Sequence, residues 1–362
     1  MQRRNFLKTA SLGAIATSSL AMPAIASSDK QLTMVTSWGR GLAGVHDAAQ
    51  RFVDKVNEMD MGVSIELKAA GELVGAFDVF DAVESGQADL WHAAPYYFTG
   101  KHMAFGFFTS VPFGMTAEEY NIWFYNMGGR ELADELFGEF DQVAMPAGNT
   151  GLQGGGWFRK EINAPEDFRG LKFRMPGLGG KVLSGMGASV INLPGSEVYQ
   201  SLATGALDGT EWIGPWADEK AGFQEITKIY YTSGMHEPGA SLTTTFNRYV
   251  WEDLSNAQRA MIESAAAEAN AWNLGQFQSN NGAALQRLID GGVLTLNFSD
   301  DVWTAMANAA AQMYAENMND AMFKKIHDHY FSSMKQLSHW LSLSQGQYIT
   351  QRNRVQNAGL VG

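Results

Sequence analysis

The sequence contains no cysteine, and this absence excludes several classes of site. A disulfide framework, a cysteine nucleophile, a thiolate zinc site and a cysteine-ligated iron–sulfur cluster all require that residue. Basic residues are also in the minority, with 26 Lys and Arg against 38 Asp and Glu in 362 residues. Because nucleic-acid binding depends on a basic surface, this balance speaks against a nucleic-acid partner.

The motifs of common enzyme classes are missing as well. The chain has no Walker A pattern, no intact GxGxxG after a strand pattern, no GxSxG and no HExxH. His327 and His329 stand two apart on a helical pattern, which puts them on different helix faces, so we expect no shared metal there. The motif search therefore favours a function other than catalysis.

The chain does contain ample apolar material and an export signal. Hydrophobic residues make up 45% of it, which suffices for two domains or one large α/β unit. Residues 1–26 combine Arg3-Arg4, an apolar stretch and a small-x-small cleavage site, as in a twin-arginine-type signal peptide. The alternative, a membrane anchor, is disfavoured because the apolar stretch falls short of the ~20 residues needed to span. Cleavage after Ala26 removes three basic residues and no acidic one, so the formal charge changes from −12 to −15. We expect a soluble periplasmic protein.

Alternating strand and helix patterns follow the signal. Strand patterns cover residues 32–36, 63–67 and 88–93, and helical patterns cover 45–56 and 76–85. This β-α-β-α-β order predicts an α/β sheet with parallel strands.

A weak internal repeat suggests a second, similar lobe. Residues 79–89 align with residues 198–208 at a constant offset of 119, each reading as a helix, a glycine stop and an Asp that enters a strand. Two such lobes with a cleft between them are a common arrangement for capturing a small ligand. Each copy leads into an aromatic-rich segment, residues 91–97 and 210–216, at the carboxyl end of a predicted strand. Ligands of open α/β sheets bind at such strand ends.

The C-terminal part carries a long helical pattern. Neither Pro nor Gly interrupts residues 301–345. One unbroken helix here would be ~60 Å long, so it would brace both lobes or reach a partner subunit. Two helices with a bend at residues 317–320 explain the pattern equally well.

Five polar residues stand out in apolar or glycine-rich surroundings. Asn149 and Gln153 precede a run of three glycines, and Arg174 ends a strand pattern. A guanidinium there could bind a carboxylate through its planar fork. Glu211 and Glu237, with an amide oxygen, could form a site for a hard cation.

At these residues the sequence resembles the substrate-binding proteins of TRAP transporters, in particular the branch that binds 2-oxoacids together with a metal ion. The resemblance covers roughly residues 30–330. The segments that carry it are Ala70–Val74, Val79–Val83, Ala147–Gln153, Gly156–Phe158, Gly170–Gly180, Asn192–Gly195, Glu211–Pro215 and His236–Ala240.

The resemblance implies a two-lobed periplasmic binding protein fold with a long C-terminal helix. We expect lobe I to comprise residues 27–148 and 239–275, lobe II residues 149–238 and 276–300, and the C-terminal helix and tail residues 301–362. The implied function is capture of a 2-oxo monocarboxylate such as pyruvate, which is passed to the TRAP membrane subunits without catalysis. Relatives joined through their long C-terminal helices also suggest a homodimer.

The resemblance further implies roles for individual residues. Arg174 would pair with the ligand carboxylate, and Asn149 and Tyr97 would contact the ligand. The side chains of Gln153, Glu211 and Glu237 and the carbonyl of Trp212 would hold one cation, Na⁺ or Ca²⁺, and the ligand would complete its shell. The substrate contacts predicted from the resemblance are therefore Arg174, Gln153, Asn149, Tyr97 and Trp212.

Charge counting bears on the choice of cation. Two glutamates and a ligand carboxylate against one arginine leave a neutral site with Ca²⁺ and one excess negative charge with Na⁺. Because an uncompensated buried charge is costly, electrostatics favours Ca²⁺, although the family permits both ions.

Two other functions remain open at this point. A periplasmic metal-dependent enzyme acting on a 2-oxo or 2-hydroxy acid would need a proton-transfer group, for which His92 or His236 could serve. A sensory ligand-binding module would use the same pocket. The identity of the acid and the role of residues 341–362 also remain open.

Overall fold

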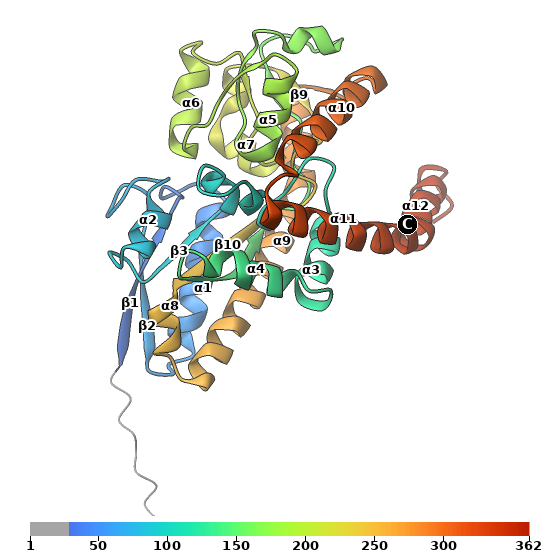
Figure 1. Cartoon of the computed structure of the whole chain (residues 1–362). Helices are drawn as coiled ribbons and strands as arrows, with labels where there is room; N and C mark the ends of the chain where they lie inside the picture. The colour runs from blue at the N-terminus through green and yellow to red at the C-terminus, as the bar shows by residue number, and fades with distance from the viewer. Residues whose placement is uncertain (1–28, 362) are drawn as a thin grey trace, which may run out of the picture.

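The computed structural model describes residues 29–361, so the predicted signal peptide at residues 1–26 lies outside the described residues. Two separate β-sheets, each covered by helices, form two lobes that lie one above the other in Figure 1. This two-lobed α/β arrangement confirms the predicted fold class. Within residues 29–361, no helix combines the length and apolar character needed to cross a membrane.

The first sheet has five strands in the order β2-β1-β3-β10-β4. β1 pairs in parallel with β2 and β3, as predicted, while β10 runs antiparallel to β3 and β4. The strand bounds are β1 Lys30–Thr36, β2 Val63–Lys68, β3 Leu90–Ala93, β4 Gln142–Asn149 and β10 Ser241–Asn247.

The second sheet has six short strands in the order β11-β9-β5-β8-β6-β7. β6 pairs in parallel with β7 and β8, and β5 runs antiparallel to β8 and β9. The strand bounds are β5 Gly156–Phe158, β6 Lys172–Arg174, β7 Ser189–Ile191, β8 Gly209–Thr210, β9 Ile229–Tyr231 and β11 Leu294–Leu296.

Helices cover both sheets, and one of them joins the lobes. α9 is 35 residues long, about 50 Å at the usual rise, and packs against α1 and β4 in the first lobe and against α7 in the second. The α-helices are α1 Val45–Glu58, α2 Val79–Glu84, α3 Ala117–Asn126, α4 Gly129–Gly138, α5 Gly177–Gly185, α6 Gly195–Ala203, α7 Pro215–Ala221, α8 Arg248–Glu252, α9 Asn256–Asp290, α10 Asp300–Asn317, α11 Ala321–Leu341 and α12 Gln347–Asn357. The 3₁₀ turns are η1 Pro95–Phe98, η2 Met103–Phe108, η3 Pro165–Phe168 and η4 Phe223–Glu225, and η5 Ser342–Gly346 is a π-helical turn.

The internal repeat is a structural one. α2 and α6 each end shortly before a glycine in the left-handed region, with φ of 77° at Gly86 and 78° at Gly205. The Asp three residues after each glycine then bonds to the backbone of a neighbouring strand, since Asp89 Oδ2 accepts from Thr33 N at 2.7 Å and Asp208 Oδ2 accepts from Lys172 N at 2.9 Å. β3 and β8 start one residue later, so corresponding residues of the two lobes build corresponding elements.

The C-terminal pattern forms two helices, so a single unbroken helix is the wrong interpretation and the bend at residues 317–320 is confirmed. α10 ends at Asn317, and α11 starts after Asp320, whose Oδ1 accepts from Phe323 N at 2.7 Å and caps the new helix. The first half of α11 packs against η2 and α3 of the first lobe and buries Phe323, Ile326 and Tyr330. The end of α11 then continues through η5 and α12 as an arm that extends away from the two lobes (Figure 1). The boundaries assigned to the two lobes stay a prediction.

Candidate functional site

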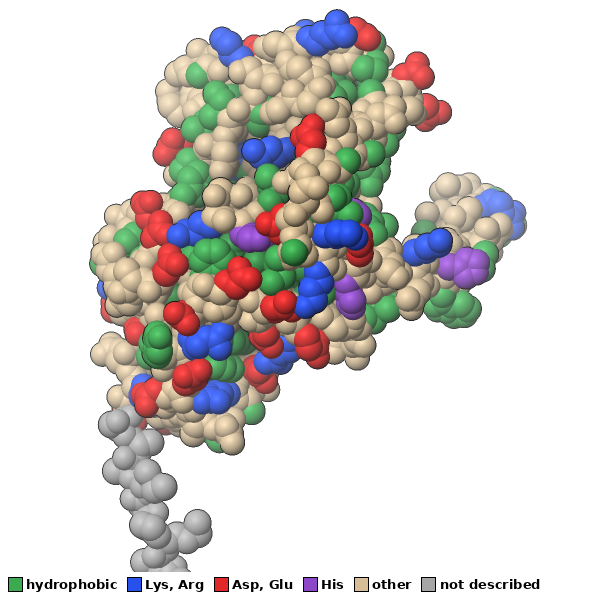
Figure 2. Space-filling model, viewed as in Figure 1, with side chains coloured by type: hydrophobic (Ala, Val, Ile, Leu, Met, Phe, Trp, Pro, Cys, Tyr) green, Lys and Arg blue, Asp and Glu red, His purple; other side chains and the backbone are tan. Residues whose placement is uncertain are grey.

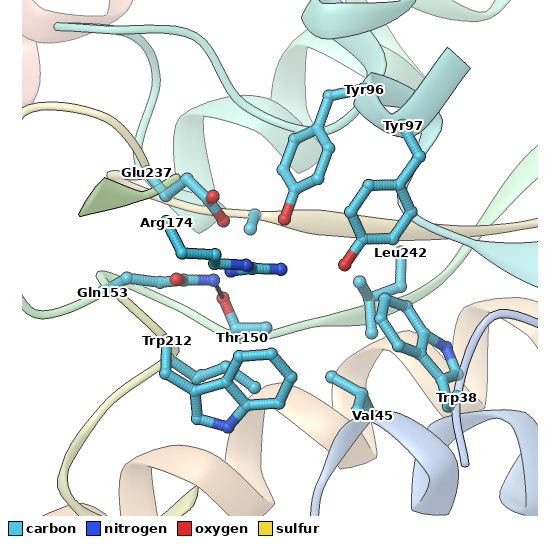
Figure 3. Close-up of a pocket in the computed structure, with 12 residues that line it drawn as sticks. Trp38, Val45, Tyr96, Tyr97, Thr150, Gln153, Arg174, Trp212, Glu237 and Leu242 are labelled. Carbon is cyan, nitrogen blue, oxygen red and sulfur yellow. Dashed lines mark hydrogen bonds between the residues drawn. The ribbon is translucent and has the colours of Figure 1, made fainter. Parts of the chain in front are cut away.

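Loops that follow three strands meet in a cavity between the lobes. Tyr97 follows β3, Arg174 is the last residue of β6, and Trp212 follows β8, so the aromatic segments after the two repeats do meet at one site. Figure 3 shows these side chains pointing toward one another. The residues that line the cavity are Trp38, Val45, Tyr96, Tyr97, Thr150, Gln153, Arg174, Trp212, Ile213, Glu237, Ala240 and Leu242.

Arg174 is the central cation of this cavity. Its side chain is 1% exposed and forms an ion pair with Glu211, which is equally buried. Arg174 Nε and Nη2 donate to the Leu193 carbonyl at 3.2 and 3.1 Å, and the guanidinium lies 5.4 Å from the Trp212 ring centroid. Burial is the largest single influence and acts to lower the pKa of Arg174, but Glu211, Tyr97, Tyr96 and Glu237 together outweigh it, so that pKa is raised. The guanidinium is therefore held charged, with further N–H groups on its terminal nitrogens.

Glu211, His236 and Glu237 form a buried cluster beside Arg174. One potential ligand atom from each lies within 4.8 Å of the others. His236 Nε2 is 3.5 Å from Glu211 Oε2. Glu211 Oε2, Glu237 Oε2 and the Gln153 amide oxygen all lack a hydrogen-bond partner among the described residues. Buried polar atoms are normally paired, so three unpaired oxygens in one place indicate a missing positive partner.

These surroundings change the pKa of the Glu237 carboxyl. Burial raises its pKa well above the ordinary value, and the nearby Glu211 charge adds to the rise, while Arg174 and a hydrogen bond from Tyr96 act against it. One arginine does not compensate two buried carboxylates. An additional cation at this cluster would complete the balance of charge.

Backbone hydrogen bonds hold the loops that carry these side chains together. Gln153 N donates to the Glu237 carbonyl at 3.0 Å, and Glu211 N donates to the Arg174 carbonyl at 3.2 Å. The glycine run after Gln153 allows the close approach, because a Cβ on Gly154 would lie 2.1 Å from the Tyr230 hydroxyl oxygen. Residues distant in the sequence are thus fixed in one rigid frame.

The opposite end of the cavity is apolar. The side chains of Trp38, Val45 and Leu242 gather there, away from Glu237 and Gln153 (Figure 3). The cavity therefore has a charged end and a hydrocarbon end.

The positions of the remaining candidate residues differ. Asn149 is fully buried at the end of β4 but does not line the cavity; its Oδ1 accepts from Gly151 N at 2.8 Å and its Nδ2 lacks a partner among the described residues. His92 accepts from Trp38 Nε1 at 2.9 Å, and burial lowers its pKa to about 4, so it is a structural histidine. The direct contact of Asn149 with ligand stays a prediction.

Sequence reasoning did not assign seven of the residues that line the cavity, among them Trp38, Tyr96 and Thr150. Tyr96, Thr150 and Trp38 line the cavity, but only Tyr97 of the tyrosine pair was expected there. The signal for Tyr96 was present in the aromatic segment after the first repeat. No pattern distinguished Trp38 and Thr150, since their place depends on how loops from both lobes meet.

Comparison with known protein families shows which class of protein carries this site. Residues 39–321 match the family model of bacterial extracellular solute-binding proteins, family 7. The chain belongs to this family. Membership in this solute-binding protein family confirms the resemblance drawn from the motifs, and with it the prediction of a binding protein instead of an enzyme.

Individual members of family 7 resemble the chain over most of its length. It is 37% identical over 357 residues to a monocarboxylate 2-oxoacid-binding periplasmic protein of Nostoc sp. PCC 7120, covering 96% of this chain and 98% of that protein. A TRAP solute-binding protein structure from Bordetella bronchiseptica RB50, a dimer with calcium and picolinate, matches with 31% identity and a TM-score of 0.89 over 91% of this chain and 99% of that one. One from Pseudoalteromonas atlantica T6c, with sodium and pyruvate bound, matches with 34% identity and a TM-score of 0.86 over 89% and 99%.

Proposed function

We propose that this protein is the periplasmic solute-binding subunit of a TRAP transporter and that it captures a 2-oxo monocarboxylate such as pyruvate through Arg174 and one bound cation. The family gives the binding role. The relative from Nostoc supports the acid class, and the structures with sodium or calcium support the cation.

The single observation that carries the proposal is the set of unpaired buried oxygens beside Arg174. Gln153 Oε1, Glu211 Oε2 and Glu237 Oε2 are of the type that Na⁺ and Ca²⁺ prefer, so the residues present fit either ion. The Trp212 carbonyl would be the fourth protein ligand. When bound, the cation would supply the positive charge that links these oxygens to the carboxylate and 2-oxo oxygens of the acid.

The protein side chains orient the acid and exclude water. Arg174 offers N–H groups to the acid carboxylate, while its pair with Glu211 and its bonds to Leu193 prevent the guanidinium from turning away. Tyr97 faces Arg174 from the other lobe, and burial raises the pKa of Tyr97 to about 12, so its hydroxyl stays a neutral hydrogen-bonding group. These contacts span both lobes and so favour the closed arrangement.

The apolar end of the cavity explains a preference for monocarboxylates. Trp38, Val45 and Leu242 offer no positive charge or hydrogen bond to a second carboxylate, which would be buried without a partner there. An alkyl group of the acid, in contrast, gains by leaving water.

A thermal-shift screen of metal-stripped protein tests the proposal. Pyruvate, 2-oxobutyrate, lactate, malate and mannonate are each added with Na⁺, with Ca²⁺ and with neither. Binding at ~1,000 times the dissociation constant adds about 4 kcal/mol of stability, which is easily detected. We expect a shift only with a 2-oxoacid and a cation together. A shift with sugar acids, or one that is indifferent to cation, would overturn the proposed ligand set.

We also propose that two copies assemble through the C-terminal arm. Trp340, Leu343 and Tyr348 on this arm are 68%, 61% and 66% exposed, which is unusual for large apolar side chains. Figure 2 shows the arm standing off from the lobes with hydrophobic side chains at its far end. The relative from Bordetella bronchiseptica is a dimer, which supports the proposal. The TRAP membrane subunits remain the proposed recipient of the acid, and the twin-arginine type of the signal stays a prediction.

A further inference from the structure

Asp218 is a buried carboxylate that none of the roles above uses. It lies on α7, is 1% exposed, and forms no ion pair with a described residue. Three N–H groups satisfy it instead: Oδ2 accepts from Trp157 Nε1 at 2.8 Å, and Oδ1 accepts from Ile213 N at 3.0 Å and Gly214 N at 2.9 Å. An unpaired carboxylate in this position is expensive to bury, so its retention calls for a reason.

The bond to Ile213 has a geometric consequence for Trp212. The Ile213 N–H and the Trp212 carbonyl belong to one planar trans peptide unit, so the two groups point in opposite directions. Asp218 holds the N–H on its own side and thereby turns the Trp212 carbonyl to the other side. Among residues 29–361 no hydrogen bond reaches that carbonyl, which leaves its oxygen free to bind another group.

The next peptide is fixed in the same way. The Ile213 carbonyl accepts from Gly154 N at 3.1 Å, directly after Gln153, so the loop held by Asp218 is joined to the loop that carries the Gln153 amide. Trp216 N donates to Asn281 Oδ1 at 3.1 Å and ties the same loop to α9. Asp218 therefore fixes the peptide between Trp212 and Ile213, and the neighbouring hydrogen bonds hold the rest of the loop in place.

We propose that Asp218 is a positioning residue of the cation site, which aims the Trp212 carbonyl at the bound ion by fixing the Ile213 N–H. The inference rests on the proposed function, since it assumes that a cation binds between Gln153, Glu211, Glu237 and Trp212. Asp218 touches neither the ion nor the acid.

Three variants test this role: Asp218→Asn, Trp157→Phe and the two combined. The amide introduced by Asp218→Asn has one acceptor oxygen for two groups of donors, so its NH₂ must face either Trp157 or the loop. This change should weaken Ca²⁺ binding about tenfold or more, in the range typical of outer-shell changes at metal sites. The Trp157→Phe change keeps both loop bonds and should leave Ca²⁺ affinity within about threefold of wild type. The double variant lets the NH₂ face the Phe ring while the oxygen accepts from Ile213 and Gly214, and should recover most of the lost affinity.

The readout is the Ca²⁺ dissociation constant by calorimetry with saturating pyruvate, together with the unfolding midpoint of the cation-free protein. Unchanged Ca²⁺ affinity in Asp218→Asn, with only a lower midpoint, would show a merely structural role. If the double variant bound Ca²⁺ as weakly as Asp218→Asn, the charge of Asp218 and not the orientation of the peptide would matter. That result would overturn the proposal. If Asp218→Asn does not fold, the double variant decides alone. We expect its Ca²⁺ affinity to lie within about threefold of wild type, and a tenfold loss would contradict the proposal. If neither Ca²⁺ nor Na⁺ affected the wild-type protein, the proposed function itself would be contradicted.

Discussion

The Arg174 guanidinium and the Glu211 carboxylate form an ion pair in which each side chain is 1% exposed. They come from the ends of neighbouring parallel strands, β6 and β8, which brings residues 37 apart into contact. A buried pair of this kind contributes little net stability because both charges must leave water. Its value here is orientation: it fixes the guanidinium and leaves the second Glu211 oxygen unpaired beside Glu237.

Replacing Arg174 tests the binding of the acid carboxylate. Arg174→Lys keeps the charge but loses the planar fork, so pyruvate affinity should fall by tenfold or more, about 1.4 kcal/mol. Titration calorimetry at saturating Ca²⁺ measures it. Arg169→Lys, the same change at an exposed arginine outside the cavity, is the control. Pyruvate affinity of Arg174→Lys within about threefold of wild type would show that our assignment of Arg174 is wrong.

Glu237→Gln tests the cation ligands. The change removes a buried carboxylate whose pKa burial has raised, so the cation-free protein should unfold at an equal or higher temperature than wild type. The increase in unfolding temperature that Ca²⁺ and pyruvate together produce in wild type should be lost. A thermal melt with and without both ligands separates the two effects. Retention of the full ligand-induced increase would exclude Glu237 as a ligand.

Val45→Ala tests the apolar end of the cavity. Removing two methyl groups makes room for a longer alkyl chain, and each additional buried methylene is worth ~0.8 kcal/mol, or about fourfold in affinity. The variant should therefore bind 2-oxopentanoate more tightly relative to pyruvate than wild type does. The ratio of the two dissociation constants measures this preference. Val53→Ala removes the same groups from a buried residue of the same helix that does not line the cavity. An unchanged ratio in Val45→Ala would place the alkyl group elsewhere.

Truncation after Leu341 tests assembly through the arm. The shortened chain loses η5 and α12, including Leu343 and Tyr348, while both lobes keep all their strands. We expect wild type to sediment as a dimer and the truncated protein as a monomer, with unchanged pyruvate affinity. If the two proteins had the same oligomeric state in solution, a dimer built on these residues would be contradicted.

Asp218 gives a pH-dependent contribution to stability. Burial raises its pKa to about 7 from an ordinary value of 3.8, against the three N–H donors that act to lower it. Between these values the folded protein holds a proton that the unfolded chain has released, so stability falls as the pH rises, by at most ~1.4 kcal/mol per unit. The cation-free wild type should lose more stability between pH 5 and pH 7 than Asp218→Asn. Parallel pH profiles for the two proteins would contradict this origin.

Local sequence patterns predicted the elements that carry the site, because the causes of those elements are local. The glycine stops at Gly86 and Gly205 act within a few residues of the helices they end, so the repeat was visible before the structure. The strands that Asp89 and Asp208 bond to, 56 and 36 residues away, were not. The strand-end rule then located the segments that hold Tyr97 and Trp212.

Contacts between distant segments could not be predicted in the same way. The pairing of Arg174 with Glu211 depends on the register of β6 against β8, and the role of Asp218 depends on a single peptide orientation. The sequence left two interpretations open for the C-terminal helical pattern. An Asp at position 320 is compatible both with a cap at the start of a second helix, which it is, and with an exposed position inside one long helix.

The most direct test of the account is a calorimetric titration of pyruvate into metal-stripped protein in three buffers, with Ca²⁺, with Na⁺ and with K⁺ plus chelator. A cation that links the protein oxygens to the acid must make the two ligands bind interdependently. We predict that Ca²⁺ or Na⁺ tightens pyruvate binding at least tenfold over K⁺. Equal pyruvate affinity in all three buffers would contradict the cation-bridged site.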